Sequence, residues 1–81
     1  MKSSRAFVLV EVEIGKIKEV LGVLRKADEL KTIDAVTGPY DLIAVIEASD
    51  LNAITTLVTN TIGVIPGVTR TITCFAITLT P

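Results

Sequence analysis

The sequence lacks histidine and tryptophan and contains a single cysteine, Cys74, among its 81 residues. One cysteine excludes a disulfide within the chain, and without histidine it cannot complete the ligand set of a zinc site. A general base would have to be a carboxylate, a lysine or the only tyrosine. We therefore expect no metal, no cofactor and no catalytic residue. Cys74 falls in an apolar segment, and we expect it to be a buried structural thiol.

An excess of charge of one sign is also missing. The chain has eight Lys and Arg residues against nine Asp and Glu residues, for a formal net charge of −1. Direct binding of nucleic acid depends on a concentrated basic surface, so we expect no nucleic-acid partner. No run approaches the roughly 20 apolar residues that span a membrane, and the N-terminus does not resemble a signal peptide. We expect a cytoplasmic protein with no membrane partner.

The length leaves room for one domain, residues 1–81. A domain of this size buries only about 60–65% of the surface that its unfolded chain exposes, so its own core is marginal. Small domains usually gain the missing stability from a disulfide, a metal or a partner subunit. Since the first two are excluded, self-association is the expected source.

Two segments have the periodicity of amphipathic helices. In the first, apolar residues recur at i, i+3, i+4 and i+7, namely Ile17, Val20, Leu21 and Leu24. In the second, an apolar stripe runs through residues 51–62. Ser49 and Asp50 precede it with side-chain oxygens that can cap the first turn, and Gly63 is the expected stop.

Four segments are rich in Val, Ile and Thr, which suit β-strands: residues 5–14, 30–37, 41–48 and 68–79. The tight connection through Gly38, Pro39 and Tyr40 predicts that the two middle strands form a hairpin. The element order then predicts an α+β fold, the ferredoxin-like βαββαβ sandwich. In that fold two helices pack on one face of a four-stranded antiparallel sheet.

The predicted strands are apolar on both faces. In the first strand, one face carries Val8, Val10, Val12 and Ile14, and the other carries Phe7 and Leu9. A sheet with one face in water should alternate apolar and polar residues, and two helices can cover only one face. We expect a second copy of the sheet to cover the other face, with Val45 or Phe75 in the interface.

Two motifs about thirty residues apart carry a family resemblance. They are Val36-Thr37-Gly38-Pro39-Tyr40-Asp41 and Ile65-Pro66-Gly67-Val68-Thr69-Arg70-Thr71-Ile72-Thr73. With the apolar third strand and the element order, they resemble the C-terminal effector-binding and assembly domain of the Lrp/AsnC (feast/famine) transcription regulators. This domain is also called the RAM domain. The resemblance covers residues 6–79.

The resemblance implies that the chain dimerises through its sheets and that dimers assemble into rings. It also implies that a small effector, typically an amino acid, binds between dimers. Carried over by position, Gly38, Tyr40 and Asp41 would form the loop part of the pocket, with hydroxyls from Thr71 and Thr73. Asp41 could accept from an α-ammonium group, while hydroxyls and loop amides satisfy a carboxylate. The same residues also suit an ordinary turn and ordinary strand positions.

Full-length members of the family carry a helix-turn-helix domain, whereas only five residues precede the matching region here. DNA binding is therefore not carried over, and we expect a stand-alone module. It would bind an amino acid or similar metabolite, or co-assemble with full-length Lrp/AsnC regulators. Two alternatives come from other classes of protein: an accessory subunit that docks on an enzyme, and a small dimeric ferredoxin-like enzyme. The absence of histidine disfavours the second.

Overall fold

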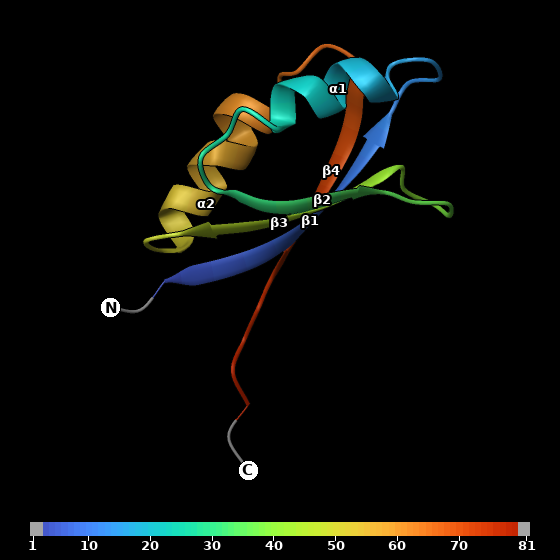
Figure 1. The fold of residues 1–81 in the computed structure, drawn as a ribbon. Coiled ribbons are helices and arrows are strands. Elements are labelled where there is room, and N and C mark those ends of the chain that lie inside the picture. The colour runs from blue at the N-terminus through green and yellow to red at the C-terminus, as the bar shows by residue number, and fades with distance from the viewer. Residues whose placement is uncertain (1–2, 80–81) are drawn as a thin grey trace.

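The computed structural model describes residues 3–79 and has the predicted order of elements. The elements are β1 (Ser4–Val12), α1 (Ile17–Leu24), β2 (Leu30–Ala35), β3 (Leu42–Ala48), α2 (Leu51–Leu57), η1 (Val58–Ile62) and β4 (Val68–Phe75). The strands form one antiparallel sheet in the order β2-β3-β1-β4. Both helices lie on one side of this sheet (Figure 1). The predicted ferredoxin-like fold is confirmed.

The core lies between the helices and the sheet. Its fully buried side chains alternate along β1 and β3 and recur on one face of each helix; they include Ala6, Val8, Val10, Leu42, Ala44, Val20, Ile54 and Ile62. Full burial of a Val, Leu or Ile side chain contributes about 1.5–3 kcal/mol. The period of two in the strands and of 3.6 in the helices therefore decides which face each element turns inward.

Helix α2 begins at the predicted cap, because Oδ1 of Asp50 accepts a hydrogen bond from the Ala53 amide at 2.8 Å. Its continuation η1 is a π-helix that ends at the predicted stop. There the Gly63 amide donates to the Val58 carbonyl at 2.7 Å, and a Cβ at Gly63 would lie only 3.1 Å from that oxygen. Within residues 3–79, no helix combines the length and the apolarity that a membrane crossing requires.

Three strands end earlier than predicted. Strand β2 ends at Ala35. Strand β1 ends at Val12, because the pairing shifts register after Glu11 and Gly15 (φ 85°) turns the chain towards α1. Ile14 therefore lies in the turn and is fully exposed, so its predicted place in the first strand, on one face with Val8, Val10 and Val12, was wrong.

The regular pairing of β4 ends at Phe75, followed by one hydrogen bond from the Ala76 amide to the Arg5 carbonyl at 2.8 Å. Because β1 begins at Ser4, this strand is too short to pair with the residues that follow Ala76. Residues 77–79 project from the sheet as an extended segment (Figure 1). We call residues 76–79 the C-terminal segment.

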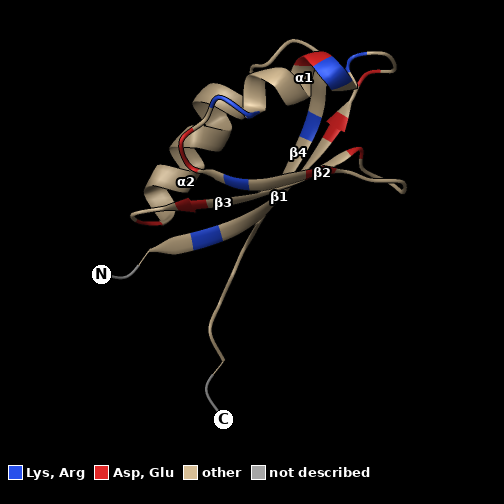
Figure 2. Cartoon of the chain, viewed as in Figure 1, with Lys and Arg blue, Asp and Glu red and all other residues tan. Residues whose placement is uncertain are grey.

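The side of the sheet that faces away from the helices, which we call the open face, is apolar in its middle. Directly opposed residues of an antiparallel pair share a face. The pairings of Phe7 with Val45 and Cys74, and of Leu9 with Ile43 and Ile72, place these side chains on the open face. Its charges lie near the strand ends (Figure 2). The open face lacks any cover within residues 3–79.

Two side chains of β4 depart from the predictions. Cys74 is exposed, so its predicted burial was wrong. It lies opposite Phe7 on the open face, where no helix covers it. Phe75 lies opposite the fully buried Ala6, which puts it on the helix-facing side of the edge strand. Of the two residues predicted for the interface, only Val45 therefore lies on the open face.

Gly67 lets the start of β4 pass close to α1. Its φ is 103°, and an added Cβ would lie 2.9 Å from Cβ of Lys16 and 3.3 Å from Cγ2 of Val20. Its carbonyl also accepts a hydrogen bond from the Glu13 amide at 2.8 Å. Both the backbone conformation and the close approach require glycine at this position.

Replacing Gly67 with Ala should lower the free energy of unfolding by about 1–3 kcal/mol, because the new Cβ is strained and meets α1. Gly22→Ala is the matched control: Gly22 lies within α1 and no atom lies within 4 Å of its added Cβ. That change should stabilise the protein by about 0.5–1 kcal/mol. Urea denaturation measures both effects. A Gly67→Ala variant as stable as wild type would contradict the proposed close approach.

Candidate functional site

The loop of residues 36–41 closes the β2–β3 hairpin at one end of the sheet. Gly38 has a φ of 136°, in the region that favours glycine. The Val36 amide donates to the Asp41 carbonyl at 2.9 Å, and the Asp41 amide donates to the Val10 carbonyl at 3.0 Å. The first bond closes the loop and the second joins it to β1. The predicted site residues Tyr40 and Asp41 are thereby held beside the end of the central strand.

The Asp41 carboxylate has a partner within the chain. Its Oδ2 accepts a hydrogen bond from the Val12 amide at 2.8 Å, next to the register shift between Glu11 and Val12. On the β3 side, the regular pairing of β1 ends at Val10 with Leu42, so the carboxylate satisfies a backbone donor that lies beyond this ladder. Oδ1 has no hydrogen-bond partner among residues 3–79. One oxygen of Asp41 therefore supports the fold, and the other is available.

Three more side chains gather at this end of the sheet. Arg70 lies opposite Glu11 on the open face, and its guanidinium carbon lies 5.9 Å from the centroid of the Tyr40 ring. This distance is within the range of a cation–π contact. The Thr69 hydroxyl donates to Oε1 of Glu11 at 3.0 Å. Phenol, guanidinium and carboxylate groups thus lie together beside the loop.

The sequence prediction missed Arg70. It lies two residues before Ile72 and four before Cys74, so strand alternation places all three on one face. That spacing was the available signal. The contact of Arg70 with Tyr40, however, depends on the order of β3, β1 and β4 in the sheet, which cannot be read from the sequence.

Thr71 and Thr73 lie on the opposite side of the sheet from Arg70. They pair with Val10 and Val8, whose side chains are buried under the helices. Strand β1 also separates β4 from β3 and its loop. Within one chain, the structure brings Tyr40 and Asp41 together but does not bring the two threonines to them. The two threonine side chains are half-buried on an edge strand, where a neighbouring copy can approach.

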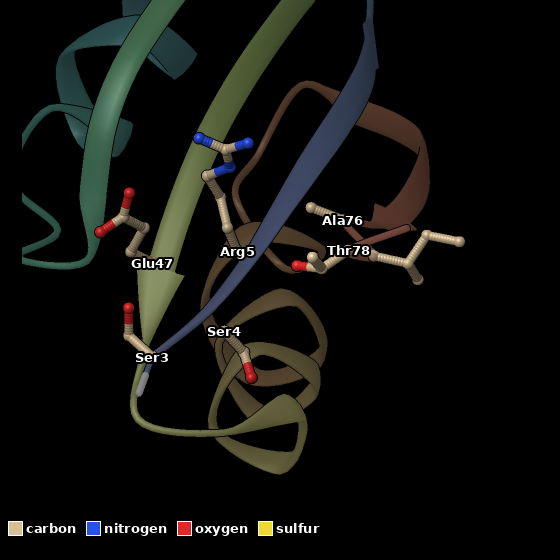
Figure 3. Close-up of a pocket in the computed structure, with 7 residues that line it drawn as sticks. Ser3, Ser4, Arg5, Glu47, Ala76 and Thr78 are labelled. Carbon is tan, nitrogen blue, oxygen red and sulfur yellow. The ribbon is translucent and has the colours of Figure 1, made fainter. Parts of the chain in front are cut away.

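Two hollows in the surface contain none of the predicted site residues. One, of about 320 Å³, is lined by Ser3, Ser4, Arg5, Glu47 and residues 76–78 (Figure 3). The other, of about 420 Å³, follows α2 and includes Glu29, Asn52 and Asn60. Across the described part of the chain, no cluster of three His, Cys, Asp or Glu residues could hold a metal ion.

A model of the Lrp/AsnC ligand binding domain matches residues 5–79. The chain belongs to the Lrp/AsnC ligand-binding domain family. The HTH-type transcriptional regulator FL11 of Pyrococcus abyssi is 35% identical over 69 residues, which cover 85% of this chain and 45% of that protein. FL11 of Pyrococcus horikoshii is 36% identical with the same coverage. The chain thus spans less than half the length of these regulators.

Solved structures agree with this assignment. FFRP-DM1 matches with a TM-score of 0.88 at 34% identity, and the match covers 91% of this chain and 99% of that one. The transcriptional regulator NMB0573 of Neisseria meningitidis, solved with L-Met, matches with a TM-score of 0.85 at 25% identity. That match covers 93% of this chain and 50% of the regulator. The predicted membership of the Lrp/AsnC family is confirmed.

The hydrogen bond of Asp41 predicts how two substitutions differ. Asp41→Ala removes the acceptor of the Val12 amide, so the free energy of unfolding should fall by about 1–3 kcal/mol. Asp41→Asn keeps an acceptor oxygen and should cost less than half as much. Urea denaturation of the two variants makes the comparison. If Asp41→Ala costs nothing, the bond to Val12 does not support the fold.

Proposed function

We propose that this chain is a stand-alone effector-sensing and assembly module of the Lrp/AsnC transcription-regulator type and that it is not an enzyme. Copies pair through the open face, dimers assemble into a ring, and an amino acid or similar metabolite binds where dimers meet. The observation that carries this proposal is the apolar middle of the open face, which the chain's own helices leave bare.

The energetics favour a second copy as the cover. Phe7 is 37% exposed on the open face, and its apolar neighbours in β3 and β4 surround it. Moving apolar surface out of water contributes about 25 cal/mol per Å². A two-fold axis lets the same patch serve both partners, so one sequence pattern suffices for both sides of the interface.

The sheet edges and the C-terminal segment support the same assembly. Ile77 and Leu79 are 77% and 83% exposed on a segment with no neighbouring strand among residues 3–79. Strand β2 is an edge strand, and within the described part of the chain no strand pairs with its outer backbone groups. Such an edge is a template for pairing with another chain, and the segment of a second copy can supply the missing strand.

The loop end of the sheet has chemistry suited to an amino acid. Oδ1 of Asp41 can accept from an α-ammonium group, and the Arg70 guanidinium can donate to a carboxylate. Thr71 and Thr73 of a neighbouring dimer would supply hydroxyls. The complex of the related NMB0573 regulator with L-Met favours an amino acid as the effector. We place the site between dimers because no single chain brings these groups together.

The stand-alone role and co-assembly draw on the comparisons. The match to FFRP-DM1 covers nearly all of that chain, so a chain of about this length occurs as a unit in a relative. The regulators FL11 carry a matching region within a longer protein. Copies of this chain could exchange with such regions through the shared interface, so co-assembly with full-length regulators is part of the proposal.

Val45→Glu should convert the protein to a monomer, because a dimer would bury two carboxylates against apolar side chains. Val64→Glu is the matched control: Val64 is 66% exposed in the connection before β4, away from the open face. Size-exclusion chromatography with light scattering measures the mass of both variants. If Val45→Glu keeps the mass of the control, the open face is not the interface.

An effector should raise the thermal midpoint of the wild-type protein, since a ligand that binds only the native state stabilises it. A scan of the common amino acids identifies it. Asp41→Asn should then weaken binding by about 2–3 kcal/mol, or roughly thirty- to two-hundred-fold. Asp28→Asn, an exposed position in the α1–β2 connection, should bind normally. A scan in which no amino acid shifts the midpoint would contradict effector sensing but not dimerisation.

A further inference from the structure

The open face has a charged pair at the end opposite the loop. Arg5 of β1 and Glu47 of β3 are directly opposed in the sheet, beyond the apolar middle. Strand β3 has seven residues, so this pair lies about 20 Å from the loop that precedes the strand. The 320 Å³ hollow lies here, between the two charged residues and the C-terminal segment (Figure 3).

These two residues do not pair with each other. Opposite charges at directly opposed positions of a sheet normally attract. Among residues 3–79, however, the only ion pair joins Lys16 and Glu19 at 3.5 Å. The guanidinium carbon of Arg5 instead lies 5.6 Å from the centroid of the Phe7 ring. The Glu47 carboxylate has no hydrogen-bond partner in the described part of the chain, and Figure 3 shows the two head groups standing apart.

The charged pair at the loop end is different. Glu11 accepts a hydrogen bond from the Thr69 hydroxyl at 3.0 Å, and Arg70 lies against the Tyr40 ring. Both arginines thus lie against an aromatic ring, but only the Glu11 carboxylate has a hydrogen-bond partner among residues 3–79, whereas the Glu47 carboxylate has none. The end with Arg5 and Glu47 is therefore where the open face offers complementary charges to something outside the chain.

The strand order decides what a second copy brings to this end. The middle of the order β2-β3-β1-β4 falls between β3 and β1. A two-fold axis that runs along the strands therefore lays β1 of one copy over β3 of the other, and the free edge β4 over the free edge β2. Arg5 of each copy then lies over Glu47 of the partner subunit. An axis across the strands would lay Arg5 over Glu11 of the partner subunit.

We infer that the dimer contains two reciprocal ion pairs, each between Arg5 of one copy and Glu47 of the partner subunit. The inference rests on the proposed dimer through the open face and specifies its geometry. Apolar burial drives association but is not directional, whereas charge pairs fix register and penalise other arrangements. Only the axis along the strands also brings the C-terminal segment to a free β2 edge.

Charge reversal tests the pairs. In Arg5→Glu alone, four carboxylates meet in the dimer, and in Glu47→Arg alone, four guanidinium groups meet. Each variant should have a dimer dissociation constant at least about tenfold above wild type at low salt, and the difference should shrink at high salt. An equimolar mixture should form a heterodimer with an affinity within about threefold of wild type, because both ion pairs are restored. Sedimentation velocity and native mass spectrometry measure the three species.

The mixing experiment distinguishes ion pairs between chains from ion pairs within one chain. In each variant, positions 5 and 47 carry the same charge, so a partner chain can rescue only a contact between chains. The control mixture is Arg5→Glu with Glu11→Arg, in which only one of the two ion pairs is restored, so its heterodimer should bind more weakly than the heterodimer of the first mixture. A control mixture that binds as tightly as the first mixture, or no rescue in the first mixture, overturns the pairing while wild type remains a dimer. A wild-type chain that stays monomeric overturns the proposed dimer and this pairing together.

Discussion

The structure depends on a sheet that is apolar on both sides and has helices on one side only. Val8 and Val10 of β1 are sealed beneath α1 and α2, while Phe7 and Leu9 of the same strand point the other way. Both helices lie on the inner face, and no other element of residues 3–79 covers the open face. Because the chain is small, its own core is marginal. A second sheet over the open face would bury further apolar side chains between the two sheets.

Strand β1 connects the interface to the candidate effector site. Its middle contributes to the open face, and at its end the Val12 amide donates a hydrogen bond to the Asp41 carboxylate. An effector that contacts the free oxygen of Asp41 would act on the strand that carries the interface. Binding between dimers would also favour the ring by mass action, since the ligand binds the assembled state in preference to separate dimers. In the proposed function, effector sensing and assembly would thus be coupled through one strand.

The sequence predicted what local physical chemistry decides. The period of the apolar residues was enough to place α1, α2 and the four strands, and a short side chain before the helix was enough to identify the Asp50 cap. The predictions that were wrong depended on contacts between distant segments. The exposure of Ile14 follows from the bulge opposite β4. The exposure of Cys74 and the place of Phe75 follow from the register of β4 against β1.

In the candidate site, too, the local features were predictable and the contacts between distant segments were not. Its loop was recognisable from Gly38 to Asp41, yet the partner of the Asp41 carboxylate is an amide 29 positions away in the sequence. Arg70 joins Tyr40 only because β4 is a neighbour of β1. Likewise, Arg5 can be placed opposite Glu47 only when the pairing of β1 with β3 is known.

The most direct test is the molecular mass of the unmodified protein, measured by sedimentation equilibrium over a range of concentrations. A bare apolar sheet face predicts at least a dimer at micromolar concentration, with a mass of two or more times the 8.6 kDa of one chain. A mass of 8.6 kDa throughout that range would mean that the open face stays exposed to water, and it would contradict the proposed dimer.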